Sequence, residues 1–528
     1  MTVEFNLADL WEIVVDAVPE REAIVCADRR FSYAETDARA NRLAHALAED
    51  GVGPGDNVGL WLYNGVEYLE GMIACFKLRA VPVNVNYRYV EDELRYLFDD
   101  ADLAAVVHEP EFAEKLDAVR GDVPSLRAAI AAGDDYEKAL ASASDARDFG
   151  PRSADDLYIL YTGGTTGMPK GVMWRHEDVF FGAFQGGNPG GGGIERPELV
   201  AESARRGRTR TLPACPFMHG TAHWMAFSTF YTGGTVVISP DHHLDPEGLW
   251  QLIADEQVSF LVIVGDAFAR PLVEALERGG NDRWDLSGLS VILSGGAILS
   301  PSVKAALVHL LPSTLLVDGY GASETGGQGQ MIAGAADASH PRFYVTDDTK
   351  VLDDDGAPVT PGSGVVGRLA RRGRIPLGYH KDPEKTAATF PVIDGVRWAV
   401  PGDMATVEAD GTITLFGRGS VSINTGGEKV YPEEVEGALK AHPSVFDAVV
   451  VGVPDERWGE VVTAVVQPRE GAVPTLDDLA EHSRALIAGY KVPRRLVLVE
   501  QVVRSPSGKP DYRWARAKVT AIGEDVVQ

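Results

Sequence analysis

A short polar segment, residues 161–171, carries residue types that bind an anionic group. It reads Tyr161-Thr-Gly-Gly-Thr-Thr-Gly-Met-Pro-Lys170-Gly171 and follows the apolar run LYILY at 157–161. Glycines allow several backbone N–H groups to converge on one anion, and the hydroxyls and the lysine add further donors. The segment fits neither the Walker A pattern nor the dinucleotide-binding pattern GxGxxG. We therefore interpret it as an anion-binding loop flanked by strands, because a purely structural turn would not need this combination of residues.

Other residues with catalytic potential form weaker patterns. His219 and His223 stand four residues apart, a spacing that could hold a metal, but no HExxH pattern or third ligand accompanies them. For His219 both a core histidine and a histidine beside a ligand pocket remain open. No GxSxG sequence is present, which disfavours a serine hydrolase. Cys26, Cys75 and Cys215 are widely spaced and are expected to be small buried hydrophobic residues.

Composition narrows the class of protein. The chain has 528 residues, a net charge of −28 and 45% hydrophobic residues, which indicates a folded protein with more than one domain. The acidic balance disfavours a nucleic-acid binder, since phosphate contacts need clustered Lys and Arg. The N-terminus has no basic segment typical of a signal peptide, and no apolar run is long enough to span a membrane. We expect a cytoplasmic enzyme without an integral membrane segment.

The elements that must position these residues alternate between strands and helices. Short apolar runs typical of buried strands lie at 22–26, 58–63, 81–85, 103–107, 260–264, 291–295 and 315–321. Helical stretches lie between them, one opened by a capping box at Ser32 and Glu35 and another by Ser300 and Pro301. This alternation predicts α/β layers with largely parallel strands. Residues 186–197 and the basic stretch 205–210 are expected to be loops, and an anion contact is the alternative for the basic stretch.

The composition of the sequence changes near residue 418. A polar, glycine-rich connector is followed by a βαβ-like unit with a helix from Pro432 to about His442, strands at 446–453 and 461–468, a helix near 476–488 and a strand at 496–500. Residues 421–528 carry a net charge of −3, whereas the preceding residues carry −25. We predict a large N-terminal α/β domain of layered sheets over 1–418 and a small C-terminal α+β domain over 419–528.

The loop at 161–171 resembles the phosphate-binding loop of the adenylate-forming superfamily, which includes acyl-CoA synthetases and AMP-dependent ligases. Further motifs of this family recur in order along the chain. They read Gly319-Tyr-Gly-Ala-Ser-Glu324-Thr325, Trp398-Ala-Val-Pro-Gly-Asp403, Gly417-Arg418, Gly426-Gly427-Glu428 with Tyr431-Pro432, and Pro506-Ser-Gly-Lys509. The ordered recurrence over almost the whole chain identifies it as a member of this superfamily.

The resemblance implies a two-step reaction that uses ATP, Mg²⁺ and CoA. Attack of a carboxylate on the α-phosphate gives acyl-AMP and pyrophosphate, and a CoA thiol then gives acyl-CoA and AMP. Catalytic roles fall on Lys509, which bridges the carboxylate and the α-phosphate, on Glu324, and on His219 at the mouth of the acyl pocket. Thr165 and Glu324 are the implied Mg²⁺ site. The implied nucleotide- and CoA-binding residues are Thr162, Gly163, Gly164, Thr165, Thr166, Gly167, Lys170, Gly295, Gly296, Ala297, Asp318, Gly319, Tyr320, Gly321, Thr325, Asp403, Arg418, Gly426 and Gly427.

Within this pattern, Asp403 is implied to hold the ribose hydroxyls, with Arg418 as an added donor, and Gly426 and Gly427 are implied to line the passage for the CoA thiol. The resemblance also implies that the small C-terminal domain is mobile and turns about a hinge. The chain departs from the family at this hinge. Ser420 and Val421 stand where many members carry Asp or Lys and an acidic residue. The free energy of hinge rotation in those family members therefore does not apply to this chain.

Two features of the sequence indicate the acid substrate: the residues predicted to line the acyl pocket and stretches that resemble a subgroup of the family. Residues 217–224 contain no acidic side chain for an ammonium group, which disfavours amino-acid adenylation. The predicted lining is apolar and suits a bulky hydrophobic acid; it comprises Trp224, Met225, Phe227, Phe230, Val264, Ala267, Phe268, Gly296 and Ala297. Several stretches resemble actinobacterial acyl-CoA synthetases that act on steroid side-chain acids. A medium- or long-chain fatty acid, an acyl-AMP ligase serving a carrier protein, and a non-catalytic nucleotide-binding module are the alternatives. A homodimer is possible.

Overall fold

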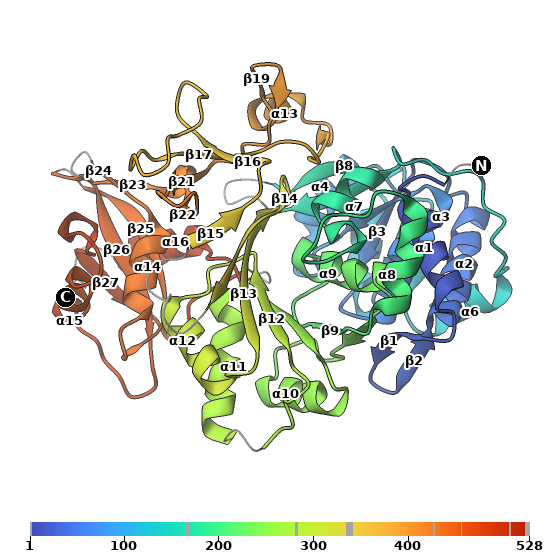
Figure 1. The fold of residues 1–528 in the computed structure, drawn as a ribbon, viewed down its shortest axis with the longest axis horizontal. Coiled ribbons are helices and arrows are strands. Elements are labelled where there is room, and N and C mark those ends of the chain that lie inside the picture. The colour runs from blue at the N-terminus through green and yellow to red at the C-terminus, as the bar shows by residue number, and fades with distance from the viewer. Residues whose placement is uncertain are drawn as a thin grey trace.

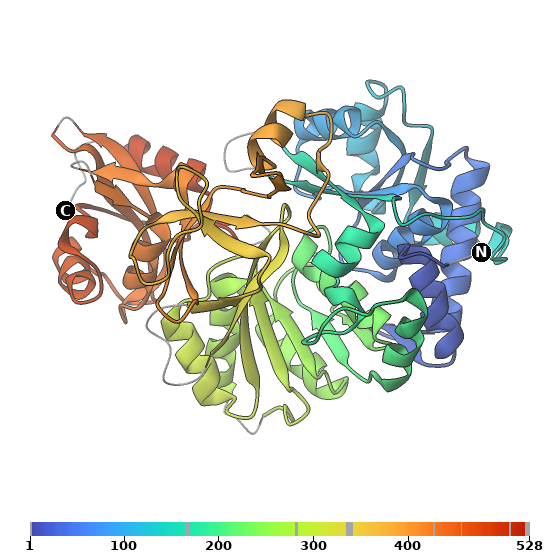
Figure 2. The same ribbon diagram turned by 45° about the horizontal axis from the view of Figure 1, so that its top comes forward.

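The computed structural model of the chain describes residues 3–163, 168–279, 283–333, 342–425, 428–455, 457–505 and 508–522. Two large sheets with helices around them make up most of the molecule, and a smaller group of strands and helices follows at the C-terminal end (Figure 1). The C-terminal elements, in orange and red, lie on the opposite side from the N-terminal elements, in blue, in both Figure 1 and Figure 2.

Seven of the described strands form one sheet in the order β18-β8-β7-β4-β3-β5-β6. Their bounds are β3 (Asn57–Trp61), β4 (Val81–Asn84), β5 (Leu103–His108), β6 (Ala128–Ala131), β7 (Leu157–Thr162), β8 (Lys170–Arg175) and β18 (Gly378–Tyr379). Strand β3 pairs in parallel with β4 and β5 through the crossover helices α3 (Val66–Leu78) and α4 (Glu91–Asp100). Every residue of β3, β4 and β5 is buried, which explains why these strands appear in the sequence as continuous apolar runs.

A second sheet joins thirteen of the described strands in the order β16-β17-β21-β22-β15-β14-β13-β12-β11-β9-β10-β1-β2. Its parallel part contains β1 (Glu22–Cys26), β9 (Arg210–Pro213), β10 (Thr235–Ile238), β11 (Phe260–Ile263), β12 (Val291–Gly295) and β13 (Leu315–Ala322). Helices α9 (Gly220–Tyr231), α10 (Pro246–Asp255), α11 (Gly265–Gly279) and α12 (Pro301–Leu310) connect these strands. Beyond β13 the sheet continues as antiparallel strands β14 (Gly326–Ala333), β15 (Arg342–Val345), β16 (Thr349–Leu352), β17 (Gly367–Arg371), β21 (Asp403–Val407) and β22 (Ile413–Arg418), and β2 (Arg29–Ser32) closes the other edge.

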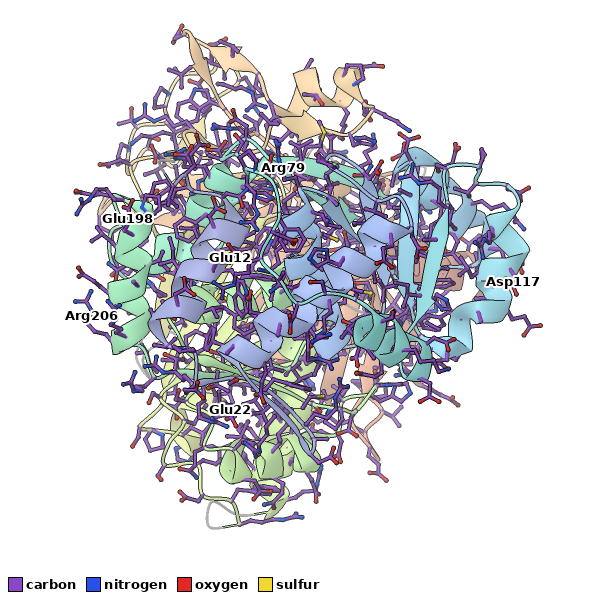
Figure 3. All side chains as sticks on the ribbon, turned by 90° about the vertical axis from the view of Figure 1, so that its right-hand side faces the viewer. Glu12, Glu22, Arg79, Asp117, Glu198 and Arg206 are labelled. Carbon is purple, nitrogen blue, oxygen red and sulfur yellow. The ribbon has the colours of Figure 1, made fainter. Side chains whose placement is uncertain are left out.

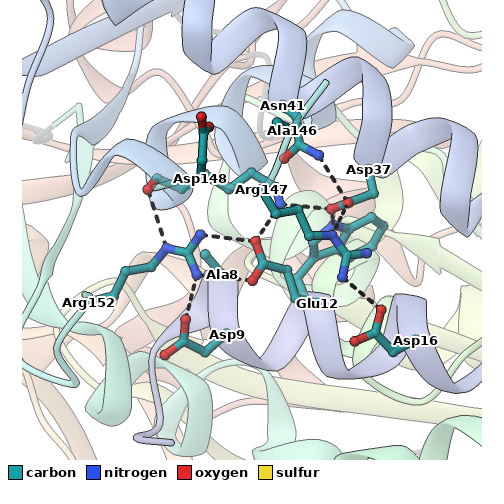
Figure 4. Close-up of polar contacts among 12 residues, drawn as sticks. Ala8, Asp9, Glu12, Asp16, Asp37, Asn41, Ala146, Arg147, Asp148 and Arg152 are labelled. Atoms are coloured by element: carbon teal, nitrogen blue, oxygen red, sulfur yellow. Dashed lines mark hydrogen bonds and ion pairs between the residues drawn. The ribbon is translucent and has the colours of Figure 1, made fainter. Parts of the chain in front are cut away.

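Buried and partly exposed ion pairs fix the segment that leads into β7. The Lys77 ammonium is fully buried and lies 2.7 Å from Glu12 of α1 (Leu7–Ala17). Glu12 also contacts Arg152 at 2.9 Å, as Figure 4 shows. Arg79, labelled with Glu12 in Figure 3, forms a 2.8 Å ion pair with Asp156 at the start of β7. Since removal of one partner of a buried pair is costly, these contacts hold the strand before the phosphate-binding loop in one position.

The remaining described elements cover the sheets or form local pairs. The capping box at Ser32 and Glu35 opens α2 (Tyr33–Glu49), as predicted. The other elements in this part are α5 (Ala113–Arg120), α6 (Asp134–Ser142), α7 (His176–Gly182), α8 (Val200–Arg206), α13 (Pro383–Thr389), β19 (Val392–Ile393) and β20 (Val396–Arg397).

The C-terminal group has its own core. Strands β23 (Ile423–Thr425), β24 (Glu428–Val430), β25 (Val445–Asp455), β26 (Gly459–Pro468) and β27 (Arg495–Leu498) form one sheet. Helices α14 (Pro432–Lys440), α15 (Leu476–Arg484) and α16 (Tyr512–Ile522) belong to the same group. Strands β25 and β26 form an antiparallel hairpin, whereas β26 and β27 are parallel and joined by α15, so the predicted βαβ character belongs to β26-α15-β27.

The predicted α/β fold class with large sheets and a smaller C-terminal group is confirmed. The predicted loop at 205–210 is wrong at both ends, because Arg205 and Arg206 end α8 and Arg210 begins β9. Arg210 forms ion pairs of 2.7 Å with Glu22 and with Glu256, which account for its charge without a bound anion. The boundary between residues 418 and 419 stays a prediction. No helix among the described residues is long and apolar enough to cross a membrane.

Candidate active site

The turn between β13 and β14 holds Glu324 and Thr325. The Glu324 side chain is 8% exposed, and its Oε1 accepts a 2.8 Å hydrogen bond from the Tyr379 hydroxyl, which orients the carboxylate. The Thr325 hydroxyl accepts from the Ala322 N–H at 3.0 Å and donates to the Gly326 carbonyl at 3.2 Å. Thr325 therefore stabilises the turn through its side chain.

Asp403 and Arg418 face each other across the β21-β22 hairpin. Their backbones are paired in register, and Arg418 Nε lies 3.7 Å from Asp403 Oδ1. Burial, followed by the charge of Asp403, raises the pKa of Tyr320 well above its ordinary value. The same region thus combines a carboxyl group, a guanidinium and a phenol, which are the donors and acceptors that a ribose and a phosphate need.

Lys509 follows a tight loop of the C-terminal group. Arg504 makes two 2.7 Å contacts with Asp447 and donates at 3.1 Å to the Gly508 carbonyl, which fixes the backbone just before Lys509. The Lys509 side chain is solvent-accessible although protein surrounds it, as expected for a residue in a cleft. This partial desolvation and the charge of Arg418 lower the pKa of the Lys509 amine, and the carboxylates of Glu324 and Asp403 oppose that shift.

The phosphate-binding loop is described only at its two ends. Thr162 pairs with Lys170 across the β7-β8 hairpin, so the loop closes between these two residues and begins with Gly163. Lys170 forms an ion pair with Asp382, and its amine lies 5.9 Å from the centre of the Tyr379 ring. Gly164, Thr165, Thr166 and Gly167, together with Gly426 and Gly427, lie outside the described residues.

The ends of β12 and β13 lie side by side in the sheet. Gly295 pairs with Gly319, and a methyl group on Gly295 would lie 3.4 Å from the Gly319 carbonyl oxygen. Gly296, with a φ of +92°, and Ala297 come directly after β12. Tyr320 and Gly321 come after Gly319 within β13.

Asp318, in contrast, forms a buried 2.6 Å ion pair with Lys304 of α12. Burial raises the pKa of the Asp318 carboxyl, and the charge of Lys304 opposes that effect. The Asp318 side chain is therefore engaged within the fold, which argues for a structural role.

His219 lies directly before α9, at its N-cap position. Burial, followed by the charge of Lys509, lowers the pKa of His219 to about 3. The imidazole is therefore neutral at pH 7. Its Nε2 is shielded from solvent and has no hydrogen-bond partner among the described residues. A neutral, unpaired imidazole near Lys509 fits a residue at the mouth of a ligand pocket.

A chain of hydrogen bonds holds the segment that carries His219. His223 Nδ1 lies 2.6 Å from the Phe217 carbonyl oxygen, so Nδ1 is the protonated nitrogen and donates. His223 Nε2 then accepts from the Tyr158 hydroxyl at 2.5 Å, and that hydroxyl accepts from Trp224 Nε1 at 2.9 Å. His223 is thus a satisfied core histidine that positions its neighbours.

Asn84 connects the two sides of the site. Its side chain accepts from the Tyr161 N–H at 2.7 Å and donates at 2.8 Å to both the Tyr161 and the Met218 carbonyls. It therefore ties the strand before the phosphate-binding loop to the segment before His219. The sequence analysis missed Asn84, Tyr158 and Tyr379. For Asn84 a signal existed, because a lone amide in the apolar run at 81–85 must find buried partners.

The predicted acyl-pocket lining divides into two groups. Phe227 and Phe230 are fully buried and pack against other aromatic rings, at 5.6 Å from Phe76 and 5.3 Å from Trp11 respectively. These two belong to the core, as do Met225 and Val264, which are 9% and 2% exposed. The remaining members that are partly or fully exposed can face a substrate; they are Trp224, Ala267, Phe268, Gly296 and Ala297.

The structure thus brings together residues from distant parts of the chain. The charges of Glu324 and Asp403 act on both Arg418 and Lys509, Arg418 also acts on Lys509, and Lys509 acts on His219. No group of three His, Cys, Asp or Glu side chains in the described part of the chain is placed to hold a metal ion. A magnesium ion would therefore need nucleotide phosphates as further ligands, and Glu324 fits such a site as its single carboxylate.

Comparison with known proteins agrees with this geometry. Residues 11–379 match the model of the AMP-binding enzyme family, and residues 434–509 match the AMP-binding enzyme C-terminal domain. The chain is 50% identical to a 3-oxocholest-4-en-26-oate–CoA ligase of Rhodococcus rhodochrous, with 97% of this chain and 95% of the relative covered. It is 49% identical to a medium/long-chain-fatty-acid–CoA/3-oxocholest-4-en-26-oate–CoA ligase of Mycobacterium tuberculosis (strain ATCC 25618 / H37Rv), with 100% and 98% covered.

Among solved structures, the anthranilate CoA ligase AuaEII in complex with anthranoyl-AMP has the same fold, with a TM-score of 0.85, 22% identity and 99% of both chains covered. The family match spans most of the chain and the relatives align along nearly its full length. The chain is therefore a member of the AMP-binding enzyme family.

Proposed function

We propose that this protein is an ATP-dependent acyl-CoA ligase. A carboxylic acid and ATP give acyl-AMP and pyrophosphate, and the thiol of CoA then gives acyl-CoA and AMP. The observation that carries the proposal is the convergence of Lys509 with Glu324, Asp403 and Arg418. These residues come from separate motifs, and together they supply the charges that transfer of an AMP group requires.

In the first half-reaction, Lys509 holds the substrate carboxylate against the α-phosphate and offsets the charge that develops on the phosphate oxygens. Lysine suits this role because its ammonium is a compact charge on a long, flexible stem. Asp403 accepts from the ribose hydroxyls, and Arg418 donates beside it. Glu324, oriented by Tyr379, is the carboxylate that would hold Mg²⁺, which would neutralise phosphate charge when bound.

In the second half-reaction, CoA replaces pyrophosphate as the group that approaches the acyl-AMP. His219 stands at the mouth of the acyl pocket, where its neutral imidazole can face a thiol without adding charge. The C-terminal group turns about the connector after Arg418 and carries Lys509 away, so that Gly426 and Gly427 line the passage for the thiol.

We propose a steroid side-chain acid such as 3-oxocholest-4-en-26-oate as the substrate. The relatives at 49% and 50% identity carry that acid in their names, and one also carries medium- and long-chain fatty acids. The partly exposed apolar residues around the site suit a bulky acyl group. Medium- and long-chain fatty acids are the second candidate.

Since ATP and CoA are cytoplasmic cosubstrates, we place the reaction in the cytoplasm. A homodimer remains a prediction.

A panel of acids tests this proposal. The purified protein is incubated with ATP, Mg²⁺ and CoA and with acetate, dodecanoate, palmitate or 3-oxocholest-4-en-26-oate, and products are identified by mass spectrometry. Preferential formation of the steroid thioester supports the full proposal. Turnover of fatty acids alone would retain the ligase and refute the steroid substrate. Acyl-AMP without acyl-CoA would indicate a ligase serving a carrier protein, and no product from any acid would refute catalysis.

A further inference from the structure

The C-terminal group contacts the large sheet domain through a buried ion pair. Lys440, the last residue of α14, places its ammonium 2.9 Å from Asp266 in the first turn of α11. The two side chains are only 2% and 5% exposed. Such a pair is formed only while the two parts of the chain are docked, because separation returns both charges to water.

Asp266 also organises the loop that follows β12. Its Oδ1 accepts a 2.7 Å hydrogen bond from the Ser300 N–H, and its backbone N–H donates at 3.1 Å to the Ile298 carbonyl. This loop begins with Gly296 and Ala297, which the sequence places beside the nucleotide. One carboxylate therefore contacts both the nucleotide-side loop and the C-terminal group.

The same turn of α11 touches the loop that carries Lys509. A methyl group added to Gly508 would lie 3.1 Å from the Val264 carbonyl oxygen and 3.3 Å from the Ala267 Cβ. Gly508 has a φ of +71° and leaves little space between the two backbones. The position of the first turn of α11 thus determines how far Lys509 can reach toward Glu324 and Asp403.

Charges around Asp266 keep it ionised in this arrangement. Burial alone would raise the pKa of its carboxyl, but the charges of Lys440 and Arg270 hold that pKa below the ordinary value. Arg270 lies 3.9 Å from Asp266, and its guanidinium stands 5.8 Å from the centre of the Phe446 ring of the C-terminal group. Two cations from the two sides of the interface therefore share one carboxylate.

A second ion pair at the same interface differs in its exposure. Arg469 lies 2.8 Å from Glu274, further along α11, but these side chains are 39% and 24% exposed. An exposed pair contributes little to docking, whereas loss of one partner of a buried pair is costly. The interface thus contains one buried and one exposed ion pair, and substitutions in the two pairs can be compared.

We propose that Asp266 and Lys440 are positioning residues for acyl-AMP formation. Their buried ion pair holds the C-terminal group where Lys509 reaches the α-phosphate, and it must open before thioester formation. This inference rests on the proposed function, because it assigns the pair to the first of the two half-reactions.

The test compares Lys440→Met and Asp266→Asn with the control Arg469→Gln. Acyl-AMP formation is followed by pyrophosphate release with dodecanoate and with 3-oxocholest-4-en-26-oate, and thioester formation is followed with chemically prepared acyl-AMP and CoA. We expect the first rate to fall about tenfold in both buried variants while the second changes less than about twofold. The control should change either rate by about twofold at most. Lys440→Arg, which keeps the charge, should recover most of the first rate.

Hydrogen–deuterium exchange gives a readout that does not need turnover. Peptides that span 264–271 and 436–447 should exchange faster in Lys440→Met than in the wild-type protein, and the control should leave them unchanged. Equal losses in both half-reactions, or unchanged exchange in Lys440→Met, would overturn the inference. If the wild-type protein forms no acyl-AMP from any acid, the proposed function fails, and the exchange data still decide whether the pair holds the docked arrangement.

Discussion

Replacement of Asn84 by alanine would remove the tie between the two sides of the site. The substitution leaves three backbone groups without their partner, namely the N–H and carbonyl of Tyr161 and the carbonyl of Met218. Asn84 is 9% exposed, so water does not readily replace the lost contacts. At about 1 kcal/mol for each group, the loss in folding free energy is about 3 kcal/mol.

This energy converts into a measurable change in melting temperature. Unfolding entropy is about 2.1 cal/mol/K per residue, so a cooperative unit of roughly 400 residues gains about 0.8 kcal/mol/K. A loss of about 3 kcal/mol then lowers the Tm by about 4 °C. We also expect kcat/KM for ATP in acyl-AMP formation to fall about tenfold, because the phosphate-binding strand and the His219 segment are no longer held together.

Asn57 is a matched control in the same sheet. Among the described residues its amide makes a single 2.6 Å hydrogen bond, to the Ala101 carbonyl, and Ala101 is not part of the proposed site. Asn57→Ala should lower the Tm by about 1 °C and leave the ATP kinetics unchanged. Differential scanning fluorimetry and pyrophosphate release measure the two quantities. A wild-type kcat/KM for ATP and a wild-type Tm for Asn84→Ala, or an equal kinetic loss in Asn57→Ala, would refute the reasoning.

Three further outcomes are expected. Lys509→Ala should lower the rate of acyl-AMP formation by about 100-fold or more and largely spare thioester formation from supplied acyl-AMP, and equal losses in the two assays would contradict its role. Lys304→Met should lower the Tm by several degrees, since breaking its buried 2.6 Å pair with Asp318 costs about 3–5 kcal/mol, and an unchanged melting curve would show that the pair is dispensable. Burial, followed by the charge of Glu436, raises the pKa of Glu433 to about 8. Between the ordinary glutamate pKa and pH 8, the Glu433 carboxyl is therefore protonated in the folded state and ionised in the unfolded state. Stability should therefore fall as pH rises toward 8 and level off above it, by up to about 1.4 kcal/mol per pH unit, and Glu433→Gln should flatten this dependence in melting curves from pH 5 to 9.

Much of the parallel part of the fold could be predicted from the sequence. The buried strands β1, β5, β7 and β12 match apolar runs closely because both faces of each strand are covered. Helix α12 begins after Ser300 at Pro301 as predicted, although the Ser300 side chain makes no capping hydrogen bond. The antiparallel continuation of the large sheet through residues 326–418 was not predicted. Its strands are short and partly exposed, as in β22, so the apolar signal is weak.

Those residues of the candidate site that belong to a local sequence motif could be predicted. Glu324, Asp403, Arg418 and Lys509 stand in recognisable motifs, and the structure places them near one another. Tyr379 and Asn84 have no local signature, because their importance comes from partners 55 and 77 residues away along the chain. Phe227 and Phe230 show the opposite difficulty, since an apolar helix gives the same composition whether it lines a pocket or packs in the core.

Isotope transfer tests the central claim, attack of the substrate carboxylate on the α-phosphate, most directly. The acid that gives the highest turnover is prepared with both carboxylate oxygens as ¹⁸O, and the products are separated and weighed by mass spectrometry. The proposed reaction predicts one ¹⁸O in AMP, one in acyl-CoA and none in pyrophosphate, because the C–O bond to the former carboxylate oxygen breaks when the thiol attacks. Unlabelled AMP, or label in inorganic phosphate with ADP as the nucleotide product, would contradict an acyl-AMP intermediate.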